Sequence, residues 1–456
     1  MKQDSSTTVP ARLPKIAWGR GLYLHDSDGK VYLDGSGGPA VYCIGHGNEE
    51  VNEAIKAQLD RVAHGYRYSF TSDPLEELTE IIVRRCAEGG GGEDGGDLDR
   101  IVFVSGGSEA VESCLKIALQ YHSARGEPSR RKFISRQRSW HGNTLGALAC
   151  SGFAERREAF EGTLIEVPLL SPVNSYRPPP GVDAEELAKW CADELEREIL
   201  RLGPQQVAAF IFEPVVGAAG GCVAAPPGYA ALIREICDRY GVVMIADEVM
   251  CGSGRCGTWR ALQHDGVLPD VMSIAKGLAG GYMPLGAAVY RRKLGEVIEA
   301  RFGAVSTGHT FTGHTAACAA GVAVQRIVER ERLVEKVAEE GPLLRRLLAE
   351  AFAATPEAGD IRGRGFFQAV ELVMDPETRE PFPAELQLHL RVREAALERG
   401  LICYPVGGNV DGRRGDHVIL APPYNVTQPE LEEIVGRLGE AVRAVLADVR
   451  GAPPSV

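Results

Sequence analysis

Residues 242–276 read VVMIADEVMCGSGRCGTWRALQHDGVLPDVMSIAK. Two short apolar runs in this stretch end at a charged side chain, the first at Asp247 and the second at Lys276. Continuous apolar runs of this length are typical of strands that are buried on both faces of a parallel sheet. Because ligands of such sheets bind at the carboxyl ends of the strands, Asp247 and Lys276 are candidate site residues.

Runs of the same kind recur in the first three quarters of the chain. IVFVS ends at Ser105, KFIS at Ser135, VAAFIFE at Glu213 and GAAVY at Tyr290. Amphipathic segments with a helical period lie between them. The alternation predicts an α/β fold built on a largely parallel sheet.

Other parts of the chain have a different pattern of apolar and polar residues. Beyond about residue 320, long charged helical patterns alternate with a few short strand-like runs, which predicts a second, smaller α+β domain. Residues 21–38, GLYLHDSDGKVYLDGSGG, alternate apolar and polar side chains around a turn and predict a hairpin. The glycine-rich segment 88–97 cannot form a core and is expected to be an exposed, flexible loop.

Composition excludes several classes of protein. The 456 residues are 44% hydrophobic and 25% charged, as in an ordinary globular protein, and the net charge of −12 disfavours nucleic acid as a partner. Eleven cysteines without a CxxC pair predict buried free thiols in a reducing compartment. No signal peptide or membrane span is evident, so we expect a cytoplasmic protein without a membrane partner, and no metal site is expected.

The segment SGGSEAVE, residues 105–112, follows one apolar run and opens a helical pattern. A turn of small residues at a helix N-terminus suits a phosphate, because the first amides and the helix dipole both favour an anion. The alternative is a glycine turn capped by Ser108 with no ligand. Neither GxGxxG nor GxxxxGK[ST] is present, which disfavours nicotinamide and ATP chemistry.

Two charged residues, Lys276 and Asp247, end apolar runs and are further candidates for a binding site. Lys276 at a strand end is either a solvated surface residue or a desolvated amine that can attack a carbonyl carbon. Asp247 is either part of a salt bridge or helix cap, or the partner of a protonated pyridine nitrogen. With the aromatic Trp140 and the phosphate turn, these residues match the four parts of pyridoxal 5′-phosphate (PLP).

The same residues lie in motifs of a known family. SGGSEAVE, WHGNT, FEPVVGAAGG, ADEVMCGSGRCGTW, SIAKGLAGGYMPLGA and TGHTFTGHTAACAAG follow one another in this order, and HVILAPP follows in the tail. The sequence resembles the class III (ω, subgroup II) aminotransferases of the fold-type I PLP enzymes. The resemblance implies a large PLP-binding domain with a mostly parallel seven-stranded sheet over residues 56–325. It also implies a C-terminal small domain over 326–456, against which an N-terminal segment, 1–55, packs.

The resemblance implies roles around the PLP ring. Lys276 would form the Schiff base and then act as base and acid in the proton shift, and Asp247 would hold the pyridine nitrogen protonated. Val249 would press on one ring face and Trp140 on the other, with His141 beside it. The family usually has Tyr at the position of Trp140, which should still stack.

Further roles concern the phosphate and the substrate side. Gly107 and Ser108 would bind the phosphate. Thr310 would reach the phosphate of the neighbouring subunit, which implies a homodimer or a dimer of dimers. Glu213 resembles the acid near the O3′ side of the ring and the substrate entrance, and its alternative is a strand-end residue constrained by Pro214.

The substrate is less clearly specified. The resemblance suggests Arg413 and Arg414 as candidates for binding a substrate carboxylate, because members of the family place a mobile arginine near this position. An exposed arginine pair can equally be solvated. Tyr42 is a candidate pocket residue. No second arginine for a dicarboxylate is evident, which favours pyruvate over 2-oxoglutarate as the acceptor.

These observations predict an enzyme, a transaminase that moves an amino group from an ω-amino acid or amine to a keto acid with ping-pong kinetics. An aminomutase, an amino-acid epimerase or a decarboxylase on the same PLP site is the alternative. A noncatalytic cofactor-binding or scaffold protein is a third hypothesis. A transcriptional regulator is disfavoured because no helix-turn-helix segment or basic patch is apparent.

Overall fold

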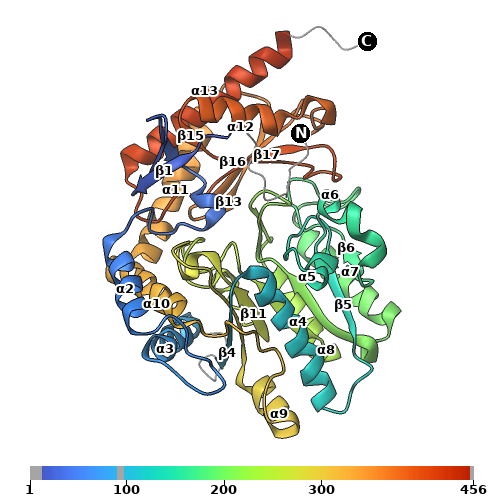
Figure 1. The fold of residues 1–456 in the computed structure, drawn as a ribbon. Coiled ribbons are helices and arrows are strands. Elements are labelled where there is room, and N and C mark those ends of the chain that lie inside the picture. The colour runs from blue at the N-terminus through green and yellow to red at the C-terminus, as the bar shows by residue number, and fades with distance from the viewer. Residues whose placement is uncertain (1–12, 90–96, 452–456) are drawn as a thin grey trace.

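The computed structural model describes residues 13–89 and 97–451 (Figure 1). Its centre is a seven-stranded sheet in which only one strand, β12, runs antiparallel to its neighbours. The mostly parallel seven-stranded sheet is therefore confirmed. In spatial order the strands are β4 (Leu98–Val104), β12 (Gly286–Arg291), β11 (Val271–Ile274), β10 (Val243–Asp247), β7 (Val207–Phe212), β5 (Lys132–Arg136) and β6 (Leu169–Leu170).

Helices cover both faces of this sheet, which is why its central strands are mostly apolar. Along β10, Val243 and Ile245 pack on one face, whereas Met244 and Ala246 pack on the other. The first face is covered by α4 (Gly107–Ala124), α5 (Leu145–Cys150) and α9 (Arg292–Phe302). The second is covered by α3 (Asp73–Ala87), α7 (Leu187–Leu202), α8 (Tyr229–Tyr240) and α10 (Thr315–Arg330).

A second, smaller α+β unit follows, as predicted. Its antiparallel sheet has the order β13 (Ala358–Arg364), β14 (Phe367–Leu372), β17 (Asp416–Leu420) and β16 (Tyr404–Gly407). It is accompanied by α11 (Leu333–Phe352), α12 (Leu388–Glu398) and α13 (Gln428–Gly451).

The N-terminal hairpin forms between β2 (Tyr23–Asp26) and β3 (Val31–Asp34). A further strand, β1 (Ile16–Arg20), pairs with β2, and β3 pairs with β15 (Leu401–Ile402). The N-terminal strands thus share a sheet with a strand of the C-terminal part (Figure 1). The domain boundaries remain predictions, and the one after residue 325 falls inside α10.

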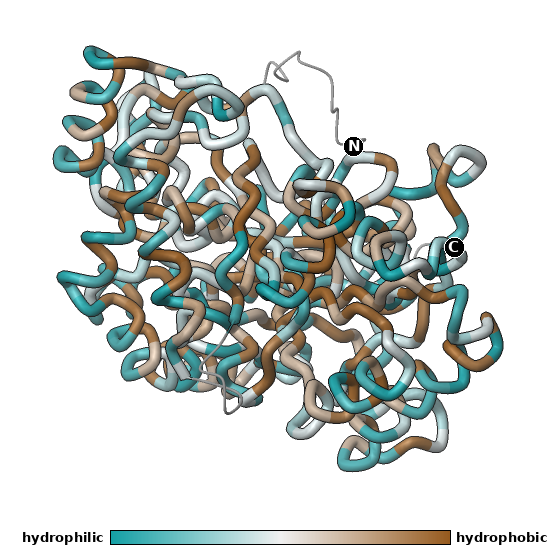
Figure 2. Tube along the Cα trace, turned by 90° about the horizontal axis from the view of Figure 1, so that it is seen from below, coloured by the Kyte–Doolittle hydropathy of each residue, from teal (hydrophilic) through white to brown (hydrophobic). Residues whose placement is uncertain are grey.

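The remaining elements are short, except for α2 (Glu49–Arg61), which packs on α10. Figure 2 shows hydrophobic segments running through the interior and hydrophilic ones on the outer helices. Residues 90–96 of the glycine-rich segment lie outside the described residues. The remaining short helices and strands, not named above, are α1 (Gly37–Ala40), α6 (Ala154–Arg157), β8 (Val215–Val216) and β9 (Val223–Ala224).

All eleven cysteines lie in the described part of the chain, where each is buried and free of a disulfide. The prediction of buried free thiols is confirmed. Over residues 13–89 and 97–451, no helix is both long and apolar enough to span a membrane.

Candidate active site

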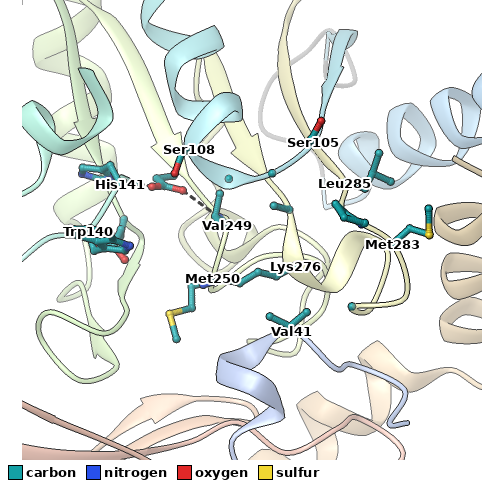
Figure 3. A pocket seen from close by; sticks show the side chains of 18 residues that line it. Val41, Ser105, Ser108, Trp140, His141, Val249, Met250, Lys276, Met283 and Leu285 are labelled. Carbon is teal, nitrogen blue, oxygen red and sulfur yellow. Dashed lines mark hydrogen bonds and ion pairs between the residues drawn. The ribbon is translucent and has the colours of Figure 1, made fainter. Parts of the chain in front are cut away.

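A cavity of about 390 Å³ lies at the carboxyl ends of the central strands (Figure 3). The structure brings eight of the predicted site residues into its wall: Gly107, Ser108, Trp140, His141, Glu213, Asp247, Val249 and Lys276. The wall is completed by Val41, Ser105, Gly106, Gly142, Met250, Ala275, Gly281, Met283, Pro284 and Leu285.

Asp247 ends β10 and is 3% exposed. Its Oδ1 accepts hydrogen bonds from the Ser273 hydroxyl at 2.8 Å and the Val249 amide at 3.1 Å. Its Oδ2 lies 2.7 Å from His141 Nδ1, which donates to it. Ser273 can reach Asp247 because the two residues are paired in register on β11 and β10. These bonds fix the orientation of the carboxylate at the cavity wall.

His141 is itself held in place by two serines. Its Nε2 lies 3.3 Å from the Ser135 hydroxyl, and its backbone amide donates to Ser151 Oγ at 2.8 Å. Ser135 and Ser273 were not among the predicted site residues. The available signal was a single serine in each otherwise apolar run, because a hydroxyl that is buried in a strand needs a polar partner.

Lys276 begins a short 3₁₀ turn just after β11. Its φ of +45° lies in the left-handed region, which a lysine rarely adopts and which marks a position held by its surroundings. Burial lowers the pKa of the amine, although the nearby carboxylates of Asp247 and Glu213 oppose this effect. A lowered pKa increases the fraction of neutral, nucleophilic amine near neutral pH.

Glu213 follows β7 and is also buried in the wall. Its Oε1 accepts a hydrogen bond from the Trp140 amide at 2.9 Å, and its Oε2 accepts one from the Gly217 amide at 2.8 Å. Burial raises the pKa of this carboxyl to about 7, against the lowering effect of His141. Glu213 therefore both ties the Trp140 loop to the sheet and presents a proton-binding group to the cavity.

The start of α4 forms a cradle for an anion. Gly107 and Ser108 begin this helix at the cavity wall, and the first amides of a helix have no partner within it. The Ser108 hydroxyl accepts a hydrogen bond from the Asn143 amide at 3.0 Å. A Cβ on Gly107 would lie 2.9 Å from Val249 Cγ1, so a larger residue at this position would have to displace the Val249 side chain.

Four predicted residues lie outside the cavity wall. Tyr42 borders it, since a Cβ on Gly281 would lie 2.5 Å from the Tyr42 ring. Thr310 is exposed. Arg413 is also exposed, and Arg414 pairs with Asp411 at 2.7 Å and Glu380 at 2.9 Å.

Glu248, the neighbour of Asp247, faces away from the site. It is 1% exposed and accepts hydrogen bonds from the amides of Ala261, at 2.5 Å, and Leu262, at 3.0 Å. Burial raises its pKa from 4.5 to about 7. Between these two pH values the folded chain holds a proton that the unfolded chain releases, so this group makes the protein less stable as pH rises.

Replacing Glu248 by glutamine is expected to remove that contribution. The free energy of unfolding, measured by urea titration from pH 4.5 to pH 7, should fall less steeply in E248Q than in the natural chain. The difference in slope should be on the order of 1 kcal/mol per pH unit. Equal slopes would show that Glu248 does not bind a proton in this range.

Comparisons with known proteins agree with this geometry. The family model described as "Aminotransferase class-III" matches residues 7–442, and the chain belongs to this family. An uncharacterized aminotransferase of Schizosaccharomyces pombe is 41% identical, over 97% of this chain and 95% of its own. The diaminobutyrate–2-oxoglutarate transaminase of Halomonas elongata is 35% identical, over 96% of this chain and 91% of its own.

A solved structure extends the comparison to the fold. The amine transaminase from an uncultivated Pseudomonas species, in a PLP-bound form, is 34% identical and superposes with a TM-score of 0.87 over 98% of each chain. The predicted class and fold type are therefore confirmed, and the protein is an aminotransferase. Enzymes of this class depend on PLP.

Proposed function

We propose that this chain binds PLP and transfers an amino group from an ω-amino acid or amine to a keto acid, with pyruvate favoured as the acceptor. The observation that carries the proposal is the shared cavity of Lys276, Asp247 and the N-terminus of α4. An amine, a carboxylate and an anion cradle around one space are the groups that the aldehyde, ring nitrogen and phosphate of PLP require.

The residues of the cavity fit this cofactor. Gly107 and Ser108 would hold the phosphate, while Val249 and Trp140 would contact the ring. When bound, PLP supplies an aldehyde that bonds to amines and a ring that withdraws electrons from the bonded substrate carbon.

The side chains of this chain would do the remaining work. Lys276 Nζ would offer a desolvated amine to the aldehyde and would serve as the base for the proton of the substrate carbon. Asp247 would keep a proton on the ring nitrogen, in an orientation that His141 and Ser273 fix. These groups are rigid because they follow buried strands, so little reorganisation is needed during the reaction.

Steady-state kinetics test the proposal against the other reactions of the same site. Transamination with a ping-pong mechanism predicts parallel double-reciprocal lines when an amine donor is varied at several pyruvate concentrations. Turnover of a single amino compound without any acceptor would instead indicate an aminomutase, an epimerase or a decarboxylase. A panel of amines and ω-amino acids against pyruvate and 2-oxoglutarate identifies the substrates. Absence of any PLP absorption after incubation with the cofactor would indicate a noncatalytic protein.

Replacing Gly107 by alanine is expected to weaken PLP binding about tenfold, because the added methyl group must displace Val249 at the cradle. Titration of the apoprotein with PLP, followed by absorbance, measures the dissociation constant. Gly436→Ala on α13 is the control, since its Cβ would meet no atom within 4 Å. Equal affinities of G107A and G436A for PLP would contradict the proposed cradle.

A homodimer or a dimer of dimers, with Thr310 completing the partner's phosphate site, is the second part of the proposal. Phe311, next to Thr310, is 54% exposed, and Tyr68 is 71% exposed. A Cβ on Gly308 would overlap the Tyr68 hydroxyl, so the segments of these residues adjoin. Exposed aromatic side chains that cluster in this way favour a protein interface.

Sedimentation equilibrium is expected to give a mass of at least about twice the 49.0 kDa of the chain. A value that stays at one chain mass at micromolar concentration would contradict the shared site. A cytoplasmic location remains a prediction from the sequence.

A further inference from the structure

A positively charged side chain lies beside the cavity wall and has no role in the site described so far. Arg156, in α6, places its guanidinium carbon 4.6 Å from the ring centroid of Trp140 and 5.1 Å from that of Phe153. Because Trp140 lines the cavity, the charge lies one aromatic ring away from it. Stacking on aromatic rings favours a guanidinium group and limits its motion.

Arg156 forms no ion pair with any residue in the described part of the chain. Burial raises the pKa of the adjacent acid, Glu155, and the charge of Arg156 is among those that oppose this rise, but the two side chains form no ion pair. The Glu155 Oε1 would lie 2.5 Å from a Cβ on Gly408. The next arginine, Arg157, donates three hydrogen bonds to the carbonyl groups of residues 148, 149 and 151. Arg157 therefore commits its Nη1 to the backbone, whereas the guanidinium of Arg156 makes no hydrogen bond to a described residue.

A second hydrogen-bond donor lies next to this cation. Tyr404 begins β16 and, like Trp140, packs against the buried cluster of Phe153, Ala218 and Ala219. Its hydroxyl makes no hydrogen bond to a described residue. Burial raises the pKa of Tyr404, so the phenol remains protonated near neutral pH, and the charge of Arg156 opposes this shift, as expected for a near neighbour. A protonated phenol can donate a hydrogen bond to an anion.

We propose that Arg156, assisted by the Tyr404 hydroxyl, binds the carboxylate of the substrate. The inference rests on the proposed function and makes it specific: the preferred partners are carboxylate-bearing keto acids and amino acids. It also differs from the sequence-based candidates: Arg414 is already paired with two acids and Arg413 is exposed, whereas Arg156 stacks on Trp140 of the cavity wall. A guanidinium group that is partly shielded from water by aromatic rings binds a carboxylate more strongly than one in open solvent.

The test compares two acceptors of similar size, pyruvate and uncharged propanal, in the holoenzyme. Arg156→Met keeps much of the apolar stem that covers Trp140 but removes the charge. The KM for pyruvate should rise about 10- to 100-fold, while the KM for propanal should change less than about threefold. Arg156→Lys should restore part of the affinity for pyruvate, and Tyr404→Phe should show a smaller effect in the same direction.

Arg413→Met is the matched control, since it removes the same charge from an exposed position outside the wall. Equal losses with both acceptors would show that Arg156 only supports Trp140 and would overturn the inference. Unchanged pyruvate kinetics in Arg156→Met, or a pyruvate-specific loss in Arg413→Met, would also overturn it.

Binding of propionate, measured by calorimetry, gives a readout that needs no turnover. The natural protein should bind propionate at least about tenfold more tightly than Arg156→Met. This result would stand even if the reaction proved to be an epimerisation or decarboxylation, so failure of the inference and failure of the proposed function are distinguishable. Equal propionate affinities would contradict the role of Arg156.

Discussion

Replacing Lys276 by alanine is expected to reduce kcat/KM for amino transfer by at least about 10⁴-fold, the largest effect of any single substitution in this chain. In the proposed reaction, the variant would lack both the amine that bonds the cofactor aldehyde and the base that moves the substrate proton. Alanine should be tolerated by the fold, because the side chain projects into the cavity rather than into the core (Figure 3). Initial rates of transamination over a range of donor concentrations, at saturating PLP and pyruvate, give the loss.

A lysine on the outside of the same domain provides the control for this variant. Lys116 is exposed on α4, so Lys116→Ala should retain full activity. Addition of a small primary amine, such as methylamine, is expected to restore some turnover to the Lys276 variant, since it replaces the missing base. A Lys276→Ala protein with near-natural activity would exclude Lys276 from the reaction.

Replacing Asp247 by asparagine is expected to have the second-largest effect, a loss in kcat of about 10²- to 10³-fold. Asparagine has nearly the same shape but carries no charge, so it no longer keeps a proton on a ring nitrogen. Asparagine also replaces one of the two acceptor oxygens, which bond to His141 and Ser273, by an NH2 donor. One of these two hydrogen bonds is therefore lost. Single-turnover measurements of each half-reaction should show the loss in both directions.

Glu248→Gln is the matched control for Asp247→Asn, because it also replaces a buried carboxylate by an uncharged amide. It removes a buried carboxylate at the next position, but that carboxylate bonds to the amides of Ala261 and Leu262 instead of facing the cavity. We expect activity within about threefold of the natural value at pH 7, in contrast to the Asp247 variant. Similar losses in both variants would indicate a general effect of removing a buried charge.

The placement of Asp247 and Lys276 could be predicted because it depends on local patterns. Each follows a continuous apolar run, and a parallel sheet brings the ends of such runs to one edge. The reversed direction of β12 did not follow from its apolar pattern, because GAAVY is equally buried in either direction. Periodicity specifies burial, whereas strand direction depends on the connection to the neighbouring strand.

The groups around the central pair were harder to predict for a physical reason. Ser273 acts through its register with Asp247, and Arg156 acts through its stacking on Trp140, so both depend on contacts between distant segments. Arg413 and Arg414 are attractive in sequence because arginines bind carboxylates. The sequence could not show that Arg414 is already paired with Glu380, 34 residues away along the chain.

The proposed reaction depends on a covalent bond between PLP and the side chain of Lys276. The direct measurement is reduction of the PLP-loaded protein with borohydride, followed by proteolysis and mass spectrometry of the peptides. The proposal predicts one stable pyridoxyl adduct, on Lys276, and none on the exposed Lys116 at stoichiometric PLP. A principal adduct on another lysine, or an unmodified Lys276 in protein that has bound PLP, would contradict it.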